Sequence, residues 1–152
     1  MIKKTLVVND DNTSLLIVCK MINKAQFADE TLTAVNGQAA LDYFEKAVAQ
    51  GKANVDAAPE FIFLDMYMPI MNGWDFLDIF SKKYAQLFPG VKIAILSSSV
   101  DPEDMKRLEK YGVVLASVTT PISLEKLNIV KEMYLNQQHP GLCMNHNNAY
   151  LN

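Results

Sequence analysis

The sequence predicts an α/β fold in which a doubly wound, five-stranded parallel sheet carries helices on both faces. Short apolar runs alternate with stretches in which apolar residues recur at helical spacing, and five such pairs follow one another. Residues 91–96 are almost continuously apolar, as expected of a strand buried on both faces. Asp65 directly follows the apolar run that ends at Leu64, and Asp10 and Asp11 come shortly after the run that ends at Val8, where α/β sheets place their ligand sites.

The first half of the chain supplies three strands and three helices. Apolar runs predict strands at residues 6–8, 31–35 and 61–64. Helical spacing predicts a helix after each strand, with the following residues on their apolar faces: Leu15, Cys19 and Ile22; Leu41, Phe44 and Val48; Phe76, Leu77 and Phe80. Asn12 or Thr13 is the expected cap of the first helix, because both side chains can accept a hydrogen bond from a free backbone N–H.

The second half repeats the pattern twice, with strands predicted at residues 91–96 and 113–118. Residues 101–104, Asp-Pro-Glu-Asp, are a strong helix start, because Asp caps, Pro fits the first turn and acids suit the positive end of the helix dipole. We expect this fourth helix to end at Gly112 and the fifth to start at Ser123. The apolar face of the fifth helix consists of Leu127, Val130 and Tyr134.

Length and composition indicate one globular domain followed by a tail. The 152 residues suffice for one sizeable core, and a hydrophobic fraction of 50% is ordinary for such a domain. The Gln, Asn, His and Pro residues after Asn136 predict a domain at residues 1–136 and a flexible tail at residues 137–152. No DNA-binding module is visible, and a net charge of −3 disfavours a non-specific nucleic-acid surface.

The sequence also predicts a cytoplasmic location. No apolar run approaches the length of a membrane span, and the run at residues 6–8 is too short for a signal peptide. Cys19 and Cys143 lie in dissimilar surroundings and predict neither a disulfide framework nor a zinc site. We interpret His139 and His146, in the polar tail, as solvated residues rather than metal ligands.

Carboxylates at the ends of two strands predict a metal site. Asp65 ends the third apolar run, and Asp10 and Asp11 follow the first. Because the carboxyl ends of parallel strands meet at one edge of a sheet, we expect these side chains to form one cluster. Three carboxylates with no nearby base indicate a hard cation such as Mg²⁺. A strand-end Asp is often only a turn or cap residue, but here several strand ends agree.

These strand-end residues, taken together, resemble the receiver domain of two-component response regulators. The segment Asp65-Met66-Tyr67-Met68-Pro69, followed by Met71-Asn72-Gly73, is similar to the phosphoacceptor loop D-x-x-M-P-x-M-x-G of that family. Ser97 ends the fourth strand and Pro121 follows the fifth, as in the family. The resemblance covers residues 3–135. The chain looks like a stand-alone receiver and is similar in organisation to the single-domain chemotaxis regulator of this family. This similarity implies a flavodoxin-like sheet with the strand order 2-1-3-4-5.

The resemblance implies a phosphoryl-transfer reaction. Asp65 would accept the phosphoryl group from a histidine kinase or a phosphotransfer protein. Mg²⁺ would be bound by the carboxylates of Asp10 and Asp65 and by the backbone carbonyl of Tyr67, with Asn9 or Asp11 as a further contributor.

The resemblance also implies how the signal leaves the site. The hydroxyl of Ser97 would bond a phosphoryl oxygen and move the loop before the fourth helix. A protein target would then bind the face formed by the fourth helix, the fifth strand and the fifth helix, which could equally serve a homodimer. We therefore expect a signalling protein and not an enzyme acting on an external substrate.

Three positions depart from the family pattern. Asn9 and Asp10 fill the places of the two acids that usually follow the first strand, unless a register slip makes Asp10 and Asp11 the pair. Thr120 stands where the family has a lysine before the proline, so a positive charge is missing. Ser117 stands at the position of the aromatic residue on the fifth strand. The last two departures leave open a degenerate receiver that acts as a phosphorylation-independent interaction module.

The strand-end residues disfavour two other protein classes. A haloacid-dehalogenase-type phosphohydrolase carries a second Asp, its general acid, two residues after the nucleophile, whereas Tyr67 follows Asp65 at this distance and Asn12 follows Asp10. A flavodoxin needs a phosphate-binding loop rich in Ser, Thr and Gly after the first strand. Here the carboxylates of that loop would repel a phosphate.

Overall fold

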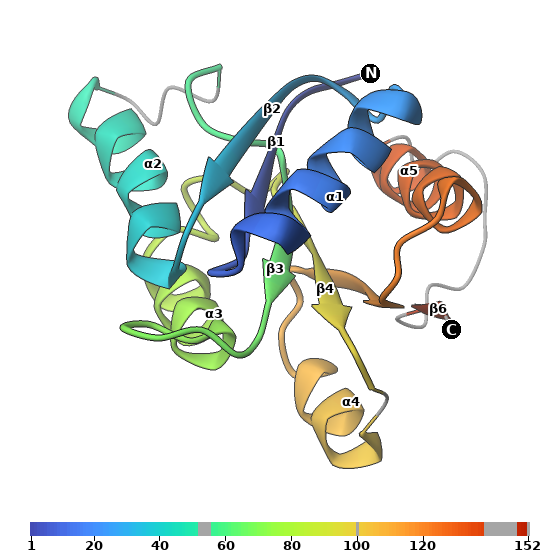
Figure 1. The fold of residues 1–152 in the computed structure, drawn as a ribbon. Helices are drawn as coiled ribbons and strands as arrows, with labels where there is room; N and C mark the ends of the chain where they lie inside the picture. The colour runs from blue at the N-terminus through green and yellow to red at the C-terminus, as the bar shows by residue number, and fades with distance from the viewer. Residues whose placement is uncertain (52–55, 100, 139–148, 152) are drawn as a thin grey trace.

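The computed structural model describes residues 1–51, 56–99, 101–138 and 149–151. In these residues a six-stranded parallel sheet has the order β2-β1-β3-β4-β5-β6 (Figure 1). The strands are β1 (Ile2–Val8), β2 (Ala28–Ala34), β3 (Phe61–Asp65), β4 (Lys92–Ser97), β5 (Val114–Thr119) and β6 (Ala149–Leu151). The helices are α1 (Asn12–Lys24), α2 (Gly37–Ala49), α3 (Gly73–Lys83), α4 (Pro102–Leu108) and α5 (Leu124–Gln138). The predicted doubly wound fold and the order 2-1-3-4-5 are confirmed.

The helices form two layers on opposite faces of the sheet. Figure 1 shows α1 and α5 on one face and α2 and α3 on the other. Each central strand contributes side chains to the core on both faces of the sheet, because successive side chains point to opposite faces. Leu6 and Val8 belong to the buried cluster under α2 and α3, and Val7 between them belongs to the cluster under α1 and α5. Burial on both faces explains why the central strands are so continuously apolar.

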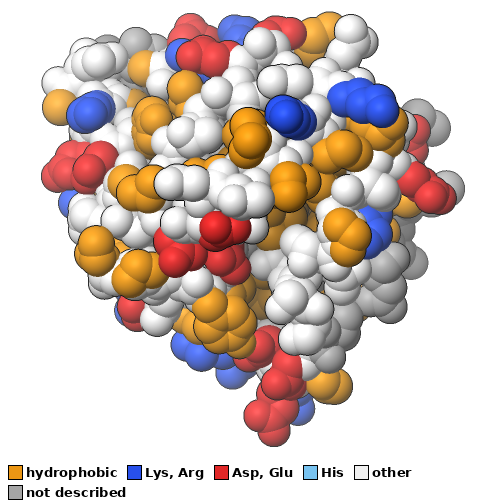
Figure 2. Space-filling view, viewed as in Figure 1, with side chains coloured by type: hydrophobic (Ala, Val, Ile, Leu, Met, Phe, Trp, Pro, Cys, Tyr) orange, Lys and Arg blue, Asp and Glu red, His pale blue; other side chains and the backbone are white. Residues whose placement is uncertain are grey.

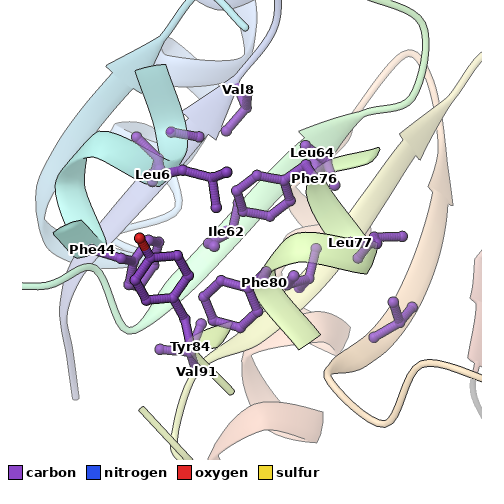
Figure 3. Close-up of a cluster of buried hydrophobic side chains, with 14 of the residues drawn as sticks. Leu6, Val8, Phe44, Ile62, Leu64, Phe76, Leu77, Phe80, Tyr84 and Val91 are labelled. Carbon is purple, nitrogen blue, oxygen red and sulfur yellow. The ribbon is translucent and has the colours of Figure 1, made fainter. Parts of the chain in front are cut away.

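Aromatic residues fill both layers of the core. Figure 3 shows the cluster under α2 and α3, in which the rings of Phe44 and Phe80 meet edge to face with centroids 4.9 Å apart. On the opposite face, Phe27 packs edge to face against Phe61 with centroids 5.1 Å apart. All four side chains are fully buried. Burying a side chain of this size contributes about 1.5–3 kcal/mol, so these layers hold the strand ends in place.

Side-chain caps start the helices and set where the loops turn. Asp11 caps α1, because its carboxylate accepts a hydrogen bond from the backbone N–H of Ser14 at 2.9 Å. The expectation that Asn12 or Thr13 caps this helix is wrong, because the helix already begins at Asn12 and the cap lies directly before it. Asp101 caps α4 as predicted.

Several elements differ in length from the prediction. β1 and β2 begin earlier than expected, because their ladder already pairs Ile2 with Ala28. Polar residues interrupt the apolar pattern at the start of both strands, so apolar runs alone do not indicate where the strands begin. α4 ends at Leu108, and turns rather than helix lead on to Gly112.

The expected tail contains a strand that the sequence did not predict. Residues 149–151 form β6, which pairs in parallel with β5. The hydroxyl of Tyr150 lies 3.3 Å from the carbonyl oxygen of Met105 and 3.1 Å from Glu109, on the side of α4. A three-residue strand held by backbone pairing has almost no sequence pattern. The expectations for His139, Cys143 and His146 fall outside the described residues.

Gly73 fixes the loop that leaves the end of β3. A Cβ atom at this position would lie 2.5 Å from the sulfur of Met66, 2.7 Å from its Cα and 2.9 Å from the carbonyl oxygen of Asp65. The N–H of Gly73 also donates to the carbonyl of Met66 at 2.9 Å. The start of α3 can therefore pack this closely on the loop only because Gly73 has no side chain.

We expect Gly73→Ala to lower the free energy of unfolding by about 1–3 kcal/mol, because the added methyl group displaces backbone atoms. Urea denaturation followed by circular dichroism measures this change. Gly112→Ala is the matched control, since nothing lies within 4 Å of its Cβ position, and its effect should stay within about 0.5 kcal/mol. Equal destabilisation by the two substitutions would contradict the packing argument.

Candidate functional site

The carboxyl ends of β1, β3, β4 and β5 surround one open cleft of about 520 Å³. Every site residue predicted from the sequence lines it: Asn9, Asp10, Asp11, Asp65, Tyr67, Ser97 and Thr120. The register of the sheet brings them together, because Val8 pairs with Leu64 and Ser97 pairs with Thr119. The predicted clustering of distant strand ends is therefore confirmed as a geometric fact.

The surface around the cleft is acidic and partly apolar. Figure 2 shows a group of acidic side chains bordered by hydrophobic ones, and the Lys and Arg side chains visible in this view lie apart from that group. Ile17 of α1 is an apolar member of the cleft wall and is 50% exposed. The arrangement favours a cation or a cation-bearing ligand in the cleft.

Asp65 lies at the end of β3, half-buried in the cleft wall. Burial raises the pKa of its carboxyl group, and the negative charge of Asp10 adds to that rise, while backbone N–H groups of Tyr67 and Met66 oppose it. The N–H of Tyr67 lies 3.4 Å from Oδ1 of Asp65. The carboxylate is thus held in place, but its charge lacks full compensation.

The residues after β1 divide their roles. Asp11 accepts hydrogen bonds from the hydroxyl and the backbone N–H of Ser14, at 2.6 and 2.9 Å, and these bonds lower its pKa. Asn9 is buried, and its side-chain oxygen accepts the N–H of Asp11 at 2.9 Å. Asp10 lines the cleft and acts electrostatically on Asp65. All three residues line the cleft, and the side chains of Asn9 and Asp11 are engaged by backbone N–H groups of the loop and of the first turn of α1.

The donor set of the cleft fits Mg²⁺. Asp10 and Asp65 offer carboxylate oxygens, and the loop after β3 offers the backbone carbonyl of Tyr67, which are the hard ligands that Mg²⁺ prefers. Within the described residues, no group of three or more His, Cys, Asp or Glu side chains is arranged to hold a metal ion. Two carboxylates and one carbonyl suffice, because Mg²⁺ usually keeps several waters.

Ser97 and Thr120 lie on neighbouring strand ends and are joined through the backbone. The N–H of Thr120 donates to the carbonyl oxygen of Ser97 at 2.8 Å, and the Thr120 hydroxyl lies 3.4 Å from the same oxygen. The Ser97 hydroxyl donates to the carbonyl of Ser99 in the loop that leads to α4. Both residues line the cleft, and the hydroxyl of each is engaged by a backbone carbonyl.

Lys126 is a residue that the sequence analysis did not single out. Its ammonium group donates to the carbonyl oxygens of Thr119 at 2.8 Å and Pro121 at 3.3 Å, on either side of Thr120. It does not line the cleft. A lysine in a helical pattern normally indicates solvent exposure, so the sequence held no signal of this contact. Lys126 fixes the loop after β5 but leaves the charge of the cleft acidic.

Comparison with protein families decides the wider assignment. Residues 5–129 match the family described as the response regulator receiver domain. The chain belongs to this family. A search of curated proteins found no match. The expected resemblance is confirmed, and the chain is a receiver domain, a module that takes phosphoryl groups in two-component signalling.

Solved structures of other receivers share the fold. A two-component response regulator from Cytophaga hutchinsonii is 27% identical, with a TM-score of 0.78 over 89% of this chain and 98% of that chain. A chemotaxis response regulator of Vibrio cholerae is 20% identical, with a TM-score of 0.66 over 88% of this chain and 99% of that one. A phosphorylated cyanobacterial phytochrome response regulator is 19% identical, with a TM-score of 0.66 over 93% and 98%. The last two likenesses concern the fold alone.

The described helices of this receiver include none that is both long and apolar enough to cross a membrane. This finding agrees with the lack of a spanning run in the sequence.

We expect Asp65→Asn to raise the free energy of unfolding at pH 7. Because the folded-state pKa of Asp65 is raised, the unfolded chain releases this proton first, and folding loses stability as pH rises through the folded pKa. The gain should vanish below the ordinary value of 3.8, where both states are protonated. Urea unfolding in Mg²⁺-free buffer from pH 3 to pH 7 measures it.

Asp29→Asn serves as the control, because it removes an exposed carboxylate of β2 outside the cleft. The same gain in both variants at every pH would mean that the burial of Asp65 is not the cause.

Proposed function

We propose that this receiver accepts a phosphoryl group on Asp65 from a histidine kinase or a phosphotransfer protein in the cytoplasm, in a Mg²⁺-dependent reaction. It then signals by binding a protein target and turns over no external substrate. The observation that carries this proposal is the placement of Asp65 beside Asp10 in one cleft of a receiver-family chain.

The reaction is a transfer from nitrogen to oxygen. A carboxylate oxygen of Asp65 attacks phosphorus, an O–P bond forms, the P–N bond to the donor histidine breaks, and the imidazole takes up a proton. A negative nucleophile and a negative phosphoryl group repel each other, and Mg²⁺ supplies the neutralising charge. Asp10, Asp65 and the Tyr67 carbonyl would hold the ion.

The hydroxyl of Ser97 would donate to a phosphoryl oxygen. It now donates to the carbonyl of Ser99, so the new bond requires the old one to break. The loop after β4 is thereby released from one contact when Asp65 is phosphorylated. This exchange supports the view that phosphorylation acts on the segment leading to α4.

The missing lysine makes the reaction depend more heavily on the metal. Thr120 brings a hydroxyl to the cleft but no charge, and the ammonium of Lys126 is engaged by backbone carbonyls outside it. The positive charge needed at the transition state then has to come from Mg²⁺.

The downstream target would bind the face formed by α4, β5 and α5, which a homodimer could also use. β6 already pairs with the edge of β5, and Tyr150 contacts α4, so the chain covers part of this face itself. A partner that needs the β5 edge has to displace β6.

A degenerate receiver that binds its partner without phosphorylation is the second candidate. Two observations favour it: Thr120 replaces the lysine, and Ser117 is a small buried residue at the place of the strand-5 aromatic.

The deciding experiment is incubation with acetyl phosphate or phosphoramidate at a series of Mg²⁺ concentrations, with intact mass as the readout. We expect a phosphoryl adduct that requires Mg²⁺ and is absent in Asp65→Asn. Asp29→Asn, which removes a carboxylate outside the cleft, should still take the adduct. No adduct at any Mg²⁺ concentration, from protein shown to be folded, would favour the degenerate receiver.

We expect Thr120→Lys to lower the Mg²⁺ concentration needed for half-maximal phosphorylation by about tenfold, because a lysine at the cleft would compensate part of its negative charge. The same mass assay measures this shift. Asn128→Lys adds an equal charge to an exposed position of α5 and should leave the Mg²⁺ dependence unchanged. An unchanged dependence in Thr120→Lys would refute the role assigned to the missing charge.

A further inference from the structure

α4 is held to the rest of the molecule largely by polar and aromatic contacts. It buries only Met105 and Leu108 among its residues, and Figure 1 shows it extending beyond the ends of the strands. The guanidinium group of Arg107 lies over the ring of Trp74 in α3, 4.0 Å from the centroid. An element with so little apolar burial can change position at low cost, which makes α4 suited to two states.

Tyr67 connects this helix to the phosphoacceptor. Its backbone N–H lies 3.4 Å from Oδ1 of Asp65, and its hydroxyl donates to Oδ2 of Asp104 in α4 at 3.2 Å. The carboxylate of Asp104 raises the pKa of the Tyr67 hydroxyl, so the hydroxyl keeps its proton and remains a donor. One residue thus contacts Asp65 through its backbone and α4 through its side chain.

A hollow of about 20 Å³ lies between Tyr67, α4 and β5. Ser117 of β5 lines it, and the Ser117 hydroxyl is buried with no hydrogen-bond partner among the described residues. Trp74 and Met105 also line it. Because Ser117 is small, no aromatic side chain of β5 reaches α4 here. Tyr67, a residue that is 71% exposed, borders the hollow and has room to move.

We propose that Tyr67 couples the phosphorylation state of Asp65 to the docking of α4, a role that rests on the proposed function. Phosphorylation changes the charge and bonding of the Asp65 carboxylate that the Tyr67 N–H contacts. The backbone of Tyr67 therefore faces a free carboxylate in the unphosphorylated state and an acyl phosphate in the phosphorylated state. A tyrosine side chain has only two rotatable bonds, and a backbone shift is therefore transmitted to its hydroxyl. The hydrogen bond to Asp104 is made in the unphosphorylated state and lost on phosphorylation, which releases α4.

Trp74 provides the readout. It is the only tryptophan of the chain, and Arg107 of α4 covers its ring. Release of α4 moves this cation from the ring, which changes the tryptophan fluorescence. The signal therefore reports the docking of α4, while intact mass reports phosphorylation in the same sample.

The experiment treats wild type and Asp104→Ala with acetyl phosphate and Mg²⁺ and records both signals. We expect a comparable adduct in both proteins. The fluorescence of wild type changes on phosphorylation, whereas Asp104→Ala starts near the phosphorylated value and loses most of the change. Glu103→Ala removes the same charge from the same turn of α4, at an exposed residue, and should keep the full change.

Tyr67→Phe is the second variant, because it retains the ring and removes only the hydroxyl. Its fluorescence change is compared per phosphorylated molecule, since the Tyr67 backbone belongs to the cleft. We expect most of the change to be lost. Combining Tyr67→Phe with Asp104→Ala should cause no further loss, as expected of two groups in one contact.

The outcomes separate the coupling from the proposed function. A full fluorescence change in phosphorylated Asp104→Ala or Tyr67→Phe would overturn the coupling. An equal loss in Glu103→Ala would do the same, because charge alone would then explain the effect. An adduct on wild type without any fluorescence change would overturn the coupling and leave the proposed function standing. No adduct on wild type would overturn both.

Discussion

Asp10 and Asp65 bring two carboxylates to one cleft at the ends of neighbouring parallel strands, and the chemistry of the cleft follows from these two negative charges. The sheet places them there, because Val8 pairs with Leu64 and the carboxyl ends of β1 and β3 therefore lie at the same edge. Burial adds to the cost of the Asp65 charge. The buried residues on both faces of the sheet hold β1 and β3 in this register.

No lysine or arginine is among the described residues that line the cleft. Asp11 is committed to the start of α1, and Asn9 contributes a neutral amide. Lys126 binds the carbonyls beside Thr120 and leaves the cleft without its cation. The cleft is therefore lined by oxygen donors and hydroxyls, and under the proposed function Mg²⁺ would supply the positive charge that the reaction needs.

A small side chain also affects the connection between the cleft and α4. Ser117 leaves a hollow where an aromatic residue of β5 could have stood, and Tyr67 reaches α4 from the opposite side of that hollow. α4 depends on such contacts because it buries few apolar residues. β6 meets the same helix from the far edge of the sheet. Contacts from Tyr67 after β3 and from Tyr150 of β6 thus converge on α4.

The sequence by itself determined the five helices, five of the six described strands and the polar residues at the strand ends that line the cleft. Apolar periodicity is a local property, and a carboxylate that ends an apolar run, as at Asp65, marks a strand end without knowledge of the partner strand. The cap at Asp11, the early start of β1 and β2, and β6 were missed, because each depends on which backbone groups remain unpaired after folding. The contacts of Tyr67 with Asp104 and of Lys126 with Thr119 were decided only by the tertiary structure. They join side chains whose separation in space depends on how the helices pack on the sheet, and no local pattern encodes that distance.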